Sequence, residues 1–317
     1  MQPSKKSVLV VGDVMLDKWV YLQSVRTSPE SDAPIVRVEK EFVEMGGAGN
    51  ALRHLVNLSS GSHEFIGVIG HDSPGQKLLE ISKSIEADTQ LVTDVKRKTT
   101  VKERYFLDNA PMYRHDIESI NDIDKHIETE LFLTIQKSLS TKDSILLSDY
   151  AKGVLSLDLI SKVILLAKSL KKPIISDPGL GRIQMHAGCD TIKPNAKEWN
   201  VFVEQMGSEA IALSMLFSKG TKSVVVTQGA GGIRLIEEGI DILSQAENLD
   251  DATDVTGAGD SVAAALSLLV GSDGFDPALL PILNTVGGQT VSKSRTELPS
   301  GIEMESRLSV ATTKHRK

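Results

Sequence analysis

The sequence predicts an α/β fold: a doubly wound, mostly parallel sheet flanked by helices, with a small β flap beside it. Short apolar runs typical of buried parallel strands alternate with longer segments at helical spacing. Two regions break that alternation with period-2 patterns rich in Val, Tyr, Arg and Thr. The 317 residues are 40% apolar and 24% charged, a balance that supports one sizeable core. We therefore expect residues 1–317 to form a single domain.

Each expected element follows from its own stretch of sequence. The main-sheet strands are the apolar runs 7–12, 64–70, 144–149, 173–177 and 222–229. The helices are expected at about 47–59, 73–87, 124–140, 155–170, 196–218 and 276–292, with a further buried helix over 262–270. The flap strands are expected within 18–45 and 96–116, and residues 308–317 are expected to form a solvated tail.

Composition excludes several classes of function. The formal net charge of -7 argues against nucleic acid as a partner. Cys189 is the single cysteine, so an intrachain disulfide and a cysteine metal cluster are excluded and a reducing compartment is indicated. No apolar stretch approaches the length of a membrane span, so we expect a cytoplasmic protein without a membrane partner. The seven histidines show no metal spacing, and His54 is expected on a helix surface.

Polar residues follow several expected strands. Asp13, Asp149 and Asp177 each end a strand, and Thr227 ends another. In open α/β sheets, ligands bind beyond the carboxyl ends of the strands, so these side chains are candidates for a binding site. The alternative is that they are ordinary turn and helix-cap residues.

The stretch 254-DVTGAGDSVAAALSLLV-270 places glycines and a carboxylate at the start of a helix that is apolar on nearly all faces. The free N–H groups of Gly257, Ala258 and Gly259, together with the helix dipole, would suit a phosphate. Asp260 makes sense there if it accepts a proton from a hydroxyl that attacks the phosphate. The alternative is a glycine-rich loop before a core helix, with Asp260 placed favourably for the dipole. The Gly-Lys-Ser/Thr ending of the P-loop is absent.

Three elements together resemble the ribokinase-like (phosphofructokinase-B type) sugar kinases. They are the segment from Asp254 to Asp260, the helix-opening 46-GGAGN-50, and 194-PNAKE-198, which is similar to the Asn-x-x-Glu motif of that family. They fall in the family's order and spacing. The last element also reads as a capping box, and both interpretations can hold together.

A narrower resemblance is to the bacterial heptose 7-phosphate kinases. The segments that carry it are 12-GDVMLDKWVY-21, 26-RTSPESDAPIVRVE-39, 99-TTVKERYF-106, 113-YRHDIE-118 and 147-LSDYAKGVL-155. It implies ATP-dependent phosphorylation of the anomeric (C1) hydroxyl of a heptose 7-phosphate, a step toward the lipopolysaccharide inner core. Two alternatives stay open: a kinase for another sugar or sugar phosphate, and a non-catalytic sugar- or nucleotide-binding protein.

The resemblance implies roles at the phosphoryl-transfer and nucleotide sites. Asp260 would be the catalytic base, and the backbone of Gly257, Ala258 and Gly259 would stabilise the transferring phosphoryl group. Residues Asn195, Ala196, Lys197 and Glu198 would lie by the ATP phosphates, with Glu198 reaching Mg²⁺ through water. Thr227, Gly229 and Gly232 would line the nucleotide site, and Asn284 would lie near the adenine. The cofactors implied are ATP and Mg²⁺, with K⁺ left open.

It also implies roles on the sugar side. Asp13, helped by Asn50 and Asp17, would bind hydroxyls, and Gly46 and Gly47 would form the joint at which the flap closes. Lys102, Arg104, Arg114 and Lys152 are candidates for binding the substrate's own phosphate. Asp116 would pair with Arg114 or contact the sugar. For each flap cation the alternative is a solvated strand charge. A homodimer through the flap is also expected.

The sequence departs from the subfamily pattern at three residues. Gly179, in 177-DPGLG-181, stands where a lysine is usual, so one cation near the phosphates is missing. Arg295 replaces a glycine in 293-KSRT-296, beside a nucleotide wall or a monovalent-cation loop. Asp32 replaces a proline, where its charge could tune the choice of sugar. Some relatives carry a fused nucleotidyltransferase domain, which this length does not accommodate, so we expect the adenylyl step to need another protein.

Overall fold

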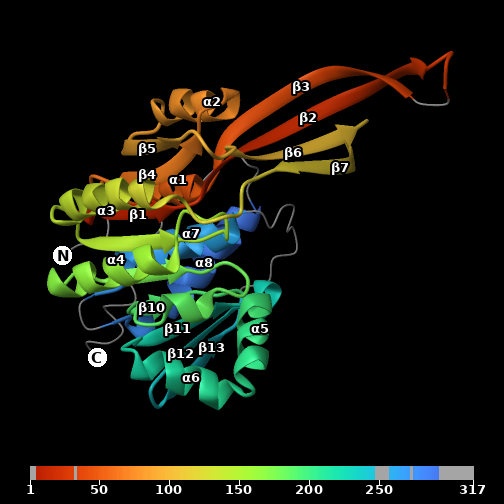
Figure 1. Cartoon of the computed structure of the whole chain (residues 1–317). Helices are drawn as coiled ribbons and strands as arrows, with labels where there is room; N and C mark the ends of the chain where they lie inside the picture. Colours follow the sequence, from red (N-terminus) through yellow and green to blue (C-terminus); the bar gives the residue numbers. More distant parts are fainter. Residues whose placement is uncertain (1–4, 32–33, 247–256, 272–273, 293–317) are drawn as a thin grey trace.

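A nine-stranded sheet forms the centre of the protein in the computed structural model, which describes residues 5–31, 34–246, 257–271 and 274–292 (Figure 1). The strand order is β13-β12-β11-β10-β9-β8-β1-β4-β5. The strands are β1 (Val8–Gly12), β4 (Glu64–Gly70), β5 (Asp88–Asp94), β8 (Ser144–Ser148), β9 (Ile174–Asp177), β10 (Thr191–Ile192), β11 (Ser223–Thr227), β12 (Ile233–Glu237) and β13 (Ile240–Ser244). Pairing is parallel from β5 to β11 and antiparallel over β11, β12 and β13, so the expected doubly wound, mostly parallel sheet is confirmed.

The period-2 alternation of the strands creates one core on each face of this sheet. In β1, Val8 and Val10 belong to the core with α1, α7 and α8, whereas Leu9 and Val11 belong to the core with α3, α4, α5 and α6. The helices are α1 (Ala48–Leu58), α2 (Ser73–Ser82), α3 (Lys125–Leu139), α4 (Leu157–Ser169), α5 (Ala196–Met206), α6 (Glu209–Ser218), α7 (Ala258–Leu269) and α8 (Leu280–Ser292). None of these helices is long and apolar enough to cross a membrane.

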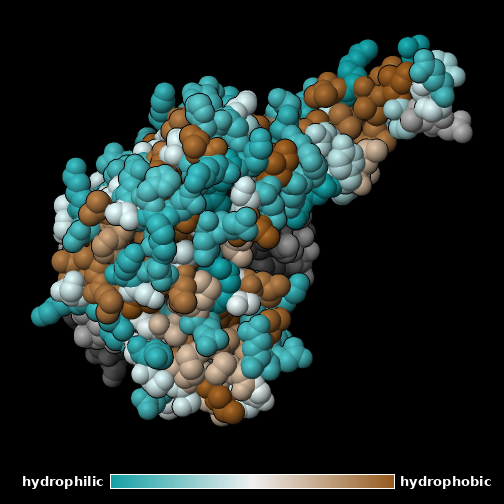
Figure 2. All heavy atoms as spheres, in the orientation of Figure 1, coloured by the Kyte–Doolittle hydropathy of each residue, from teal (hydrophilic) through white to brown (hydrophobic). Residues whose placement is uncertain are grey.

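A separate four-stranded sheet is the expected flap. Its order is β3-β2-β6-β7, and the strands are β2 (Val14–Thr27), β3 (Pro34–Gly47), β6 (Thr100–Leu107) and β7 (Ala110–Ile117). The flap projects from the body of the protein, with β2 and β3 forming its longest part (Figure 1). Apolar side chains gather on its projecting part in Figure 2. The exposed large apolar residues of the flap strands are Val25, Val36, Val38, Phe42, Met112, Tyr113 and Ile117.

The structure corrects several expectations about elements. The helix expected over 196–218 is two helices, because Gly207 adopts a left-handed φ of 88° and Ser208 then caps α6. Strands β5, β10, β12 and β13 lie outside the expected strands, since their mixed or very short patterns lack a long apolar run. His54 is buried within α1 and is not a surface residue. The tail 308–317 lies outside the described residues.

Candidate active site

The carboxyl ends of five neighbouring strands meet at one edge of the main sheet. These strands lie in the order β11-β10-β9-β8-β1, and each adjacent pair is parallel. The residues that follow the five strands therefore lie along the same edge. This edge gathers Asp13, Asp149, Asp177 and Thr227, as the sequence predicts. Asp149 accepts hydrogen bonds from Arg182 at 2.7 Å and from His186 at 2.8 Å, which gives it a structural role.

Asp260 lies in the first turn of α7 at this edge. Gly257 begins the helix with a left-handed φ of 86°, a conformation that favours glycine. α7 is buried from Asp260 to Leu269, which holds its partly exposed N-terminus in place. The first N–H groups of the helix, those of residues 257–260, have no partner within the helix, so they can meet an anion.

Both oxygens of the Asp260 carboxylate accept hydrogen bonds. Asn50 Nδ2 donates to Oδ2 at 2.7 Å, and the Tyr150 hydroxyl donates to Oδ1. Burial raises the pKa of Asp260, whereas these two hydrogen bonds and the Lys193 ammonium act to lower it. Burial and the Asp260 carboxylate raise the pKa of Tyr150 well above its usual value, so the phenol stays protonated and remains the donor.

Lys193 is a site residue to which the sequence analysis gave no role. Its Nζ forms an ion pair with Asp177 Oδ1 at 3.0 Å, and its side chain is 3% exposed. A side chain at Gly259 would begin 3.7 Å from this ammonium, so Lys193 lies beside the start of α7. Burial raises the pKa of Asp177 to about 7; the neighbouring Asp260 and Glu198 carboxylates contribute to this rise, and Lys193 opposes it. The signal that could have found Lys193 is its place at the end of a strand, directly before Pro194.

In the loop after β9, a side chain at Gly179 would begin close to neighbouring backbone atoms. A Cβ atom there would lie 3.1 Å from the Asp149 carbonyl oxygen and 3.2 Å from the Ala151 amide nitrogen. The loop therefore packs closely against the turn after β8. The lysine usual at this position in the related kinases is absent, and Lys193 places an ammonium beside Asp177, two residues away.

The Asn195–Glu198 motif forms a complete capping box at the start of α5. Asn195 Oδ1 accepts from the Glu198 N–H at 2.9 Å, and the Asn195 N–H donates to Glu198 Oε2 at 2.7 Å. The Thr227 N–H donates to the Pro194 carbonyl at 3.0 Å, which brings the end of β11 beside the motif. Ala196 and Lys197 lie in the first turn of α5. The structure thus brings the expected nucleotide-side residues together, and their nucleotide contacts stay a prediction.

The remaining nucleotide-side residues lie around the β12–β13 hairpin. Gly229 and Gly232 both have positive φ values, of 57° and 91°. A Cβ atom at Gly232 would lie 2.1 Å from the Ser244 carbonyl oxygen, so this glycine permits a close backbone approach. Asn284 Nδ2 donates to the Ser244 carbonyl at 2.7 Å and to its hydroxyl at 2.8 Å, which ties α8 to the end of β13. Its proximity to adenine stays a prediction.

Asp13 organises the turn after β8. Its carboxylate accepts N–H hydrogen bonds from Tyr150 at 2.8 Å, Lys152 at 3.0 Å and Val154 at 3.1 Å, and the residue is 1% exposed. Burial, together with the Asp149 charge, raises its pKa against the effect of these bonds. Asp13 therefore fixes the backbone that presents Tyr150, and its contact with sugar hydroxyls stays a prediction.

Gly46 and Gly47 lie where β3 leaves the flap and enters α1. A Cβ atom at Gly46 would lie 1.8 Å from Asp17 Oδ2, so the glycine makes room for that carboxylate. Gly47 has a left-handed φ of 61°, and the next N–H, that of Ala48, donates to the Asp13 carbonyl at 3.0 Å. This junction connects the base of the flap to Asp13.

Three of the four expected phosphate-binding cations are already paired with carboxylates. These pairs are Arg104 with Asp17 at 2.7 Å, Arg114 with Asp116 at 2.7 Å, and Lys152 with Glu118 at 2.6 Å. Of the two roles expected for Asp116, the structure thus shows the pairing with Arg114. Lys102, on β6, makes no ion pair within the part of the chain that the structure describes. Its Nζ lies 5.6 Å from the centre of the Tyr150 ring, and burial lowers its pKa.

The described residues contain no group of three or more His, Cys, Asp or Glu side chains that could hold a metal ion alone. Magnesium keeps several waters and needs few protein ligands, so this does not conflict with a Mg²⁺ that is carried by nucleotide phosphates. Burial raises the pKa of Asp177, Glu198 and Asp260, and the charges of Asp260 and Glu198 also act to raise that of Asp177. Such a concentration of negative charge suits a cation. Residues 293–296, the expected K⁺ loop, lie outside the described residues, as do Asp32 and Arg295.

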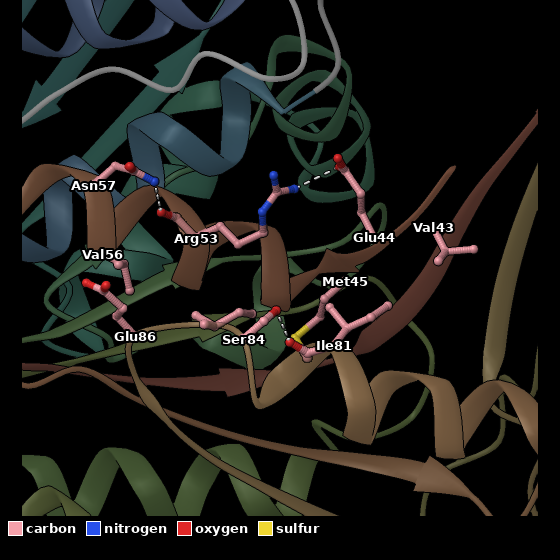
Figure 3. A pocket seen from close by; sticks show the side chains of 10 residues that line it. Val43, Glu44, Met45, Arg53, Val56, Asn57, Ile81, Ser84 and Glu86 are labelled. Atoms are coloured by element: carbon pink, nitrogen blue, oxygen red, sulfur yellow. Dashed lines mark hydrogen bonds and ion pairs between the residues drawn. The ribbon is translucent and has the colours of Figure 1, made fainter. Parts of the chain in front are cut away.

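A hollow lies at the base of the flap. It is a pocket of about 500 Å³ between β3, α1 and the end of α2 (Figure 3). Figure 3 shows the Arg53 guanidinium pointing to Glu44, and the two side chains pair at 2.8 Å. The residues that line it are Val43, Glu44, Met45, Arg53, Val56, Asn57, Ile81, Ser84, Ile85 and Glu86. None of them belongs to the cluster around Asp260.

Comparison with known proteins bears on this site. The chain is 34% identical over 308 residues to the bifunctional protein HldE of Caulobacter vibrioides, covering 94% of this chain and 62% of that protein. It is 32% identical over 303 residues to the bifunctional protein HldE of Paramagnetospirillum magneticum, with 94% and 62% covered. The chain thus spans less than two thirds of the length of these relatives.

Solved structures share the fold. Phosphofructokinase-2 from Escherichia coli, in a tetrameric inhibited form, superposes with a TM-score of 0.71 at 17% identity, covering 97% of this chain and 99% of that chain. Ribokinase from Giardia lamblia superposes with a TM-score of 0.70 at 15% identity, covering 96% and 100%. The ribokinase-like fold with its flap sheet is therefore confirmed.

The sequence matches the pfkB family carbohydrate kinases over residues 5–273, a span that includes the motif around Asn195 and the start of α7. This match removes the alternative of a non-catalytic binding protein and confirms the resemblance drawn from the three motifs. The chain belongs to the pfkB family of carbohydrate kinases and is an ATP-dependent sugar kinase.

Proposed function

We propose that this kinase transfers the γ-phosphoryl group of ATP to the anomeric C1 hydroxyl of a heptose 7-phosphate, giving a heptose 1,7-bisphosphate for lipopolysaccharide precursor synthesis. The observation that carries the chemistry is the position of Asp260 beside the free N–H groups of α7 and the Lys193 ammonium. The heptose assignment is supported by the subfamily segments of the sequence and by the HldE relatives, at 32% and 34% identity.

The acceptor hydroxyl would lie against Asp260, which takes its proton as the oxygen attacks the phosphorus atom. The N–H groups of Gly257, Ala258 and Gly259 would hold the oxygens of the transferring phosphoryl group, where negative charge is concentrated. Lys193 would add a fixed positive charge to this site. Because these groups lie at the start of a helix that is buried from Asp260 onward, they need little rearrangement during transfer.

The nucleotide would lie along the edge formed by the Asn195–Glu198 motif, Thr227 and the glycines that follow β11. When bound, Mg²⁺ would neutralise part of the phosphate charge. Glu198 would face it through water, because one of its oxygens already holds the helix cap.

The 7-phosphate of the acceptor would meet the flap. Lys102 is the strongest candidate, because Arg104, Arg114 and Lys152 are each held by a carboxylate in this structure. A phosphate reaching Lys102 would place the other end of the sugar near Tyr150 and Asp260, since Lys102 lies over the Tyr150 ring. We also propose a cytoplasmic homodimer that pairs through the exposed apolar residues of the flap.

The test is ATP consumption with Mg²⁺ against heptose 7-phosphate, sedoheptulose 7-phosphate, fructose 6-phosphate, fructose 1-phosphate, ribose and fructose. Asp260→Asn is measured beside the wild type. Turnover of heptose 7-phosphate alone, reduced by about 10²-fold or more in the variant, supports both the substrate and the base. Turnover of another sugar instead keeps the kinase chemistry and overturns the heptose assignment.

A further inference from the structure

Tyr150 stands between the catalytic base and the flap. It follows β8, and its hydroxyl donates to Asp260 Oδ1 while Asn50 donates to Oδ2 at 2.7 Å. Its backbone N–H donates to Asp13 at 2.8 Å, so its main chain is held in place. The residue as a whole keeps some exposure to solvent. The function proposed above gives this hydroxyl no role.

We propose that the Tyr150 hydroxyl occupies, in the unliganded enzyme, the place on Asp260 that the acceptor hydroxyl takes, and that the arriving acceptor displaces it before phosphoryl transfer. The proposal rests on the proposed function of Asp260 as the base toward a sugar hydroxyl. It makes Tyr150 a positioning residue, since it acts through Asp260.

The two donors are chemically alike, because a phenol O–H and a sugar O–H each present one short, charge-assisted hydrogen bond to a carboxylate oxygen. The Asn50 bond differs, since an amide N–H can support the carboxylate without competing as a proton source. The acceptor hydroxyl would therefore replace Tyr150 at Oδ1 while Asn50 stays bonded to Oδ2. The Asn50 bond would keep Asp260 oriented during the exchange. A Tyr150 that stayed on Oδ1 would compete with the acceptor for the base.

The exchange also preserves the charged form of the base. Burial raises the pKa of Asp260, and the Tyr150 hydrogen bond opposes that effect. When Tyr150 leaves, the acceptor hydroxyl donates in its place, so the carboxylate stays hydrogen-bonded and ready to take the acceptor proton. Until then the phenol fills the position in which a water molecule could accept the phosphoryl group.

The flap is connected to the same side chain. Lys102 on β6 places its ammonium 5.6 Å from the centre of the Tyr150 ring. If Lys102 binds the phosphate of the acceptor, the ring loses that contact as the hydroxyl loses Asp260. Arrival of a phosphorylated acceptor would thus release Tyr150 from both partners together.

The test uses Tyr150→Phe, with Tyr105→Phe as the matched control. Tyr105 also donates to a carboxylate, that of Glu103 at 3.2 Å, but on the flap away from Asp260. Without any sugar, Tyr150→Phe should hydrolyse ATP about tenfold faster than the wild type, because water gains access to Asp260. The acid limb of its kcat/KM profile for the acceptor should move to higher pH, because the free enzyme's Asp260 has lost a bond that lowered its pKa. Tyr105→Phe should match the wild type in both.

Fluorine NMR of the protein labelled with 3-fluorotyrosine gives a readout that needs no turnover. The chain has four tyrosines, so Tyr150→Phe identifies the Tyr150 resonance. Adding an acceptor should shift that resonance, and Asp260→Asn should shift it in the free protein. Another sugar of the panel could shift the Tyr150 resonance and also be phosphorylated by the enzyme, while heptose 7-phosphate does neither. That result would support the exchange and overturn the heptose assignment.

Two results would overturn the proposal whatever the sugar. One is unchanged ATP hydrolysis without sugar in Tyr150→Phe, together with an unchanged pH profile. The other is a lower kcat in Tyr150→Phe with no rise in hydrolysis, together with no acceptor-induced shift of the Tyr150 resonance in the wild-type protein, since the phenol would then remain on Asp260 through the transfer.

Discussion

Lys193 and Asp177 form a largely buried ion pair at 3.0 Å, at the edge of the sheet where α7 begins. The Lys193 ammonium also acts on the pKa of Asp260 and Glu198, so one cation faces three carboxylates. Burying such a pair costs more than leaving it in water unless other groups compensate. We interpret the arrangement as a positive charge held ready for phosphate, and it leads to the first prediction.

Replacing Lys193 with methionine should lower kcat by about 100-fold with a smaller effect on the KM for ATP. The physical reason is the loss of a preorganised charge that acts mainly on the transition state. Steady-state kinetics with saturating acceptor measure this. Lys222→Met is the matched control, because Lys222 also pairs with an aspartate at 3.0 Å, but at the opposite ends of the strands. Equal kcat values for the two variants would contradict the role given to Lys193.

Replacing Lys102 with methionine should raise the KM for a phosphorylated acceptor by about tenfold or more, and leave the KM for ATP nearly unchanged. A charged hydrogen bond to phosphate is the interaction that is lost. Lys96→Met is the control, because Lys96 forms its ion pair with Asp124 on the surface, outside the flap. If the KM for ATP rises and the KM for the acceptor does not, Lys102 does not bind the sugar phosphate.

His63 should make the protein sensitive to acid. Its Nδ1 accepts the Val8 N–H and its Nε2 donates to the Ser59 carbonyl, both at 3.3 Å, which requires the neutral ring. Burial lowers the pKa of His63 to about 4, from 6.5 in the unfolded chain. Between these values the unfolded state binds more protons, so this contribution to stability is full above pH 6.5 and is lost as the pH falls toward 4.

Urea unfolding at pH 7 and pH 5 should therefore show less stability at pH 5, with about 2 kcal/mol of the loss due to His63. In His63→Gln that part of the pH dependence should disappear. His126→Gln, at an exposed position on α3, should keep the wild-type dependence. A pH dependence unchanged by His63→Gln would show that His63 is not responsible.

Gly207→Ala should lower the free energy of unfolding by about 1 kcal/mol. Gly207 has a φ of 88° and nothing lies within 4 Å of the position of an added Cβ atom, so the cost is that of the backbone conformation alone. Denaturant unfolding measures it. Asn200→Ala, on the exposed side of α5, should be neutral or slightly stabilising because alanine favours helix. If Gly207→Ala unfolded at the same denaturant concentration as the wild type, the expected cost of the backbone conformation would be contradicted.

The parts of the fold that could be predicted are those that a local pattern specifies. The unbroken apolar run of β1 is enough to indicate a buried strand. The glycines before Asp260 are likewise enough to indicate the start of a helix. The break at Gly207 was missed because apolar residues continue on both sides of it, although a glycine followed by Ser208 is a helix end and a new cap. The hairpin of β12 and β13 was missed because its two strands are only five residues long and mix apolar with charged residues, so neither contains a long apolar run.

The parts of the site that could not be predicted depend on distant contacts. Tyr150 lay within a segment used for the resemblance, yet its bond to Asp260 joins residues 110 positions apart. Lys193 follows a strand of two residues, too short to give a pattern. His54 follows Arg53 on α1, and its burial arises from tertiary packing that the sequence does not show, including that of α7 against α1.

The Asn195–Glu198 pair has a consequence for how such sequences drift over evolutionary time. The same two side chains that would serve the nucleotide also hold the beginning of a helix on which the folded protein depends. A descendant that lost its catalytic activity would still be under selection to keep both residues, because losing the cap would weaken the protein itself. The pair is therefore poor evidence that a relative is active, whereas the loss of Asp260, which caps nothing, would record a change of activity directly.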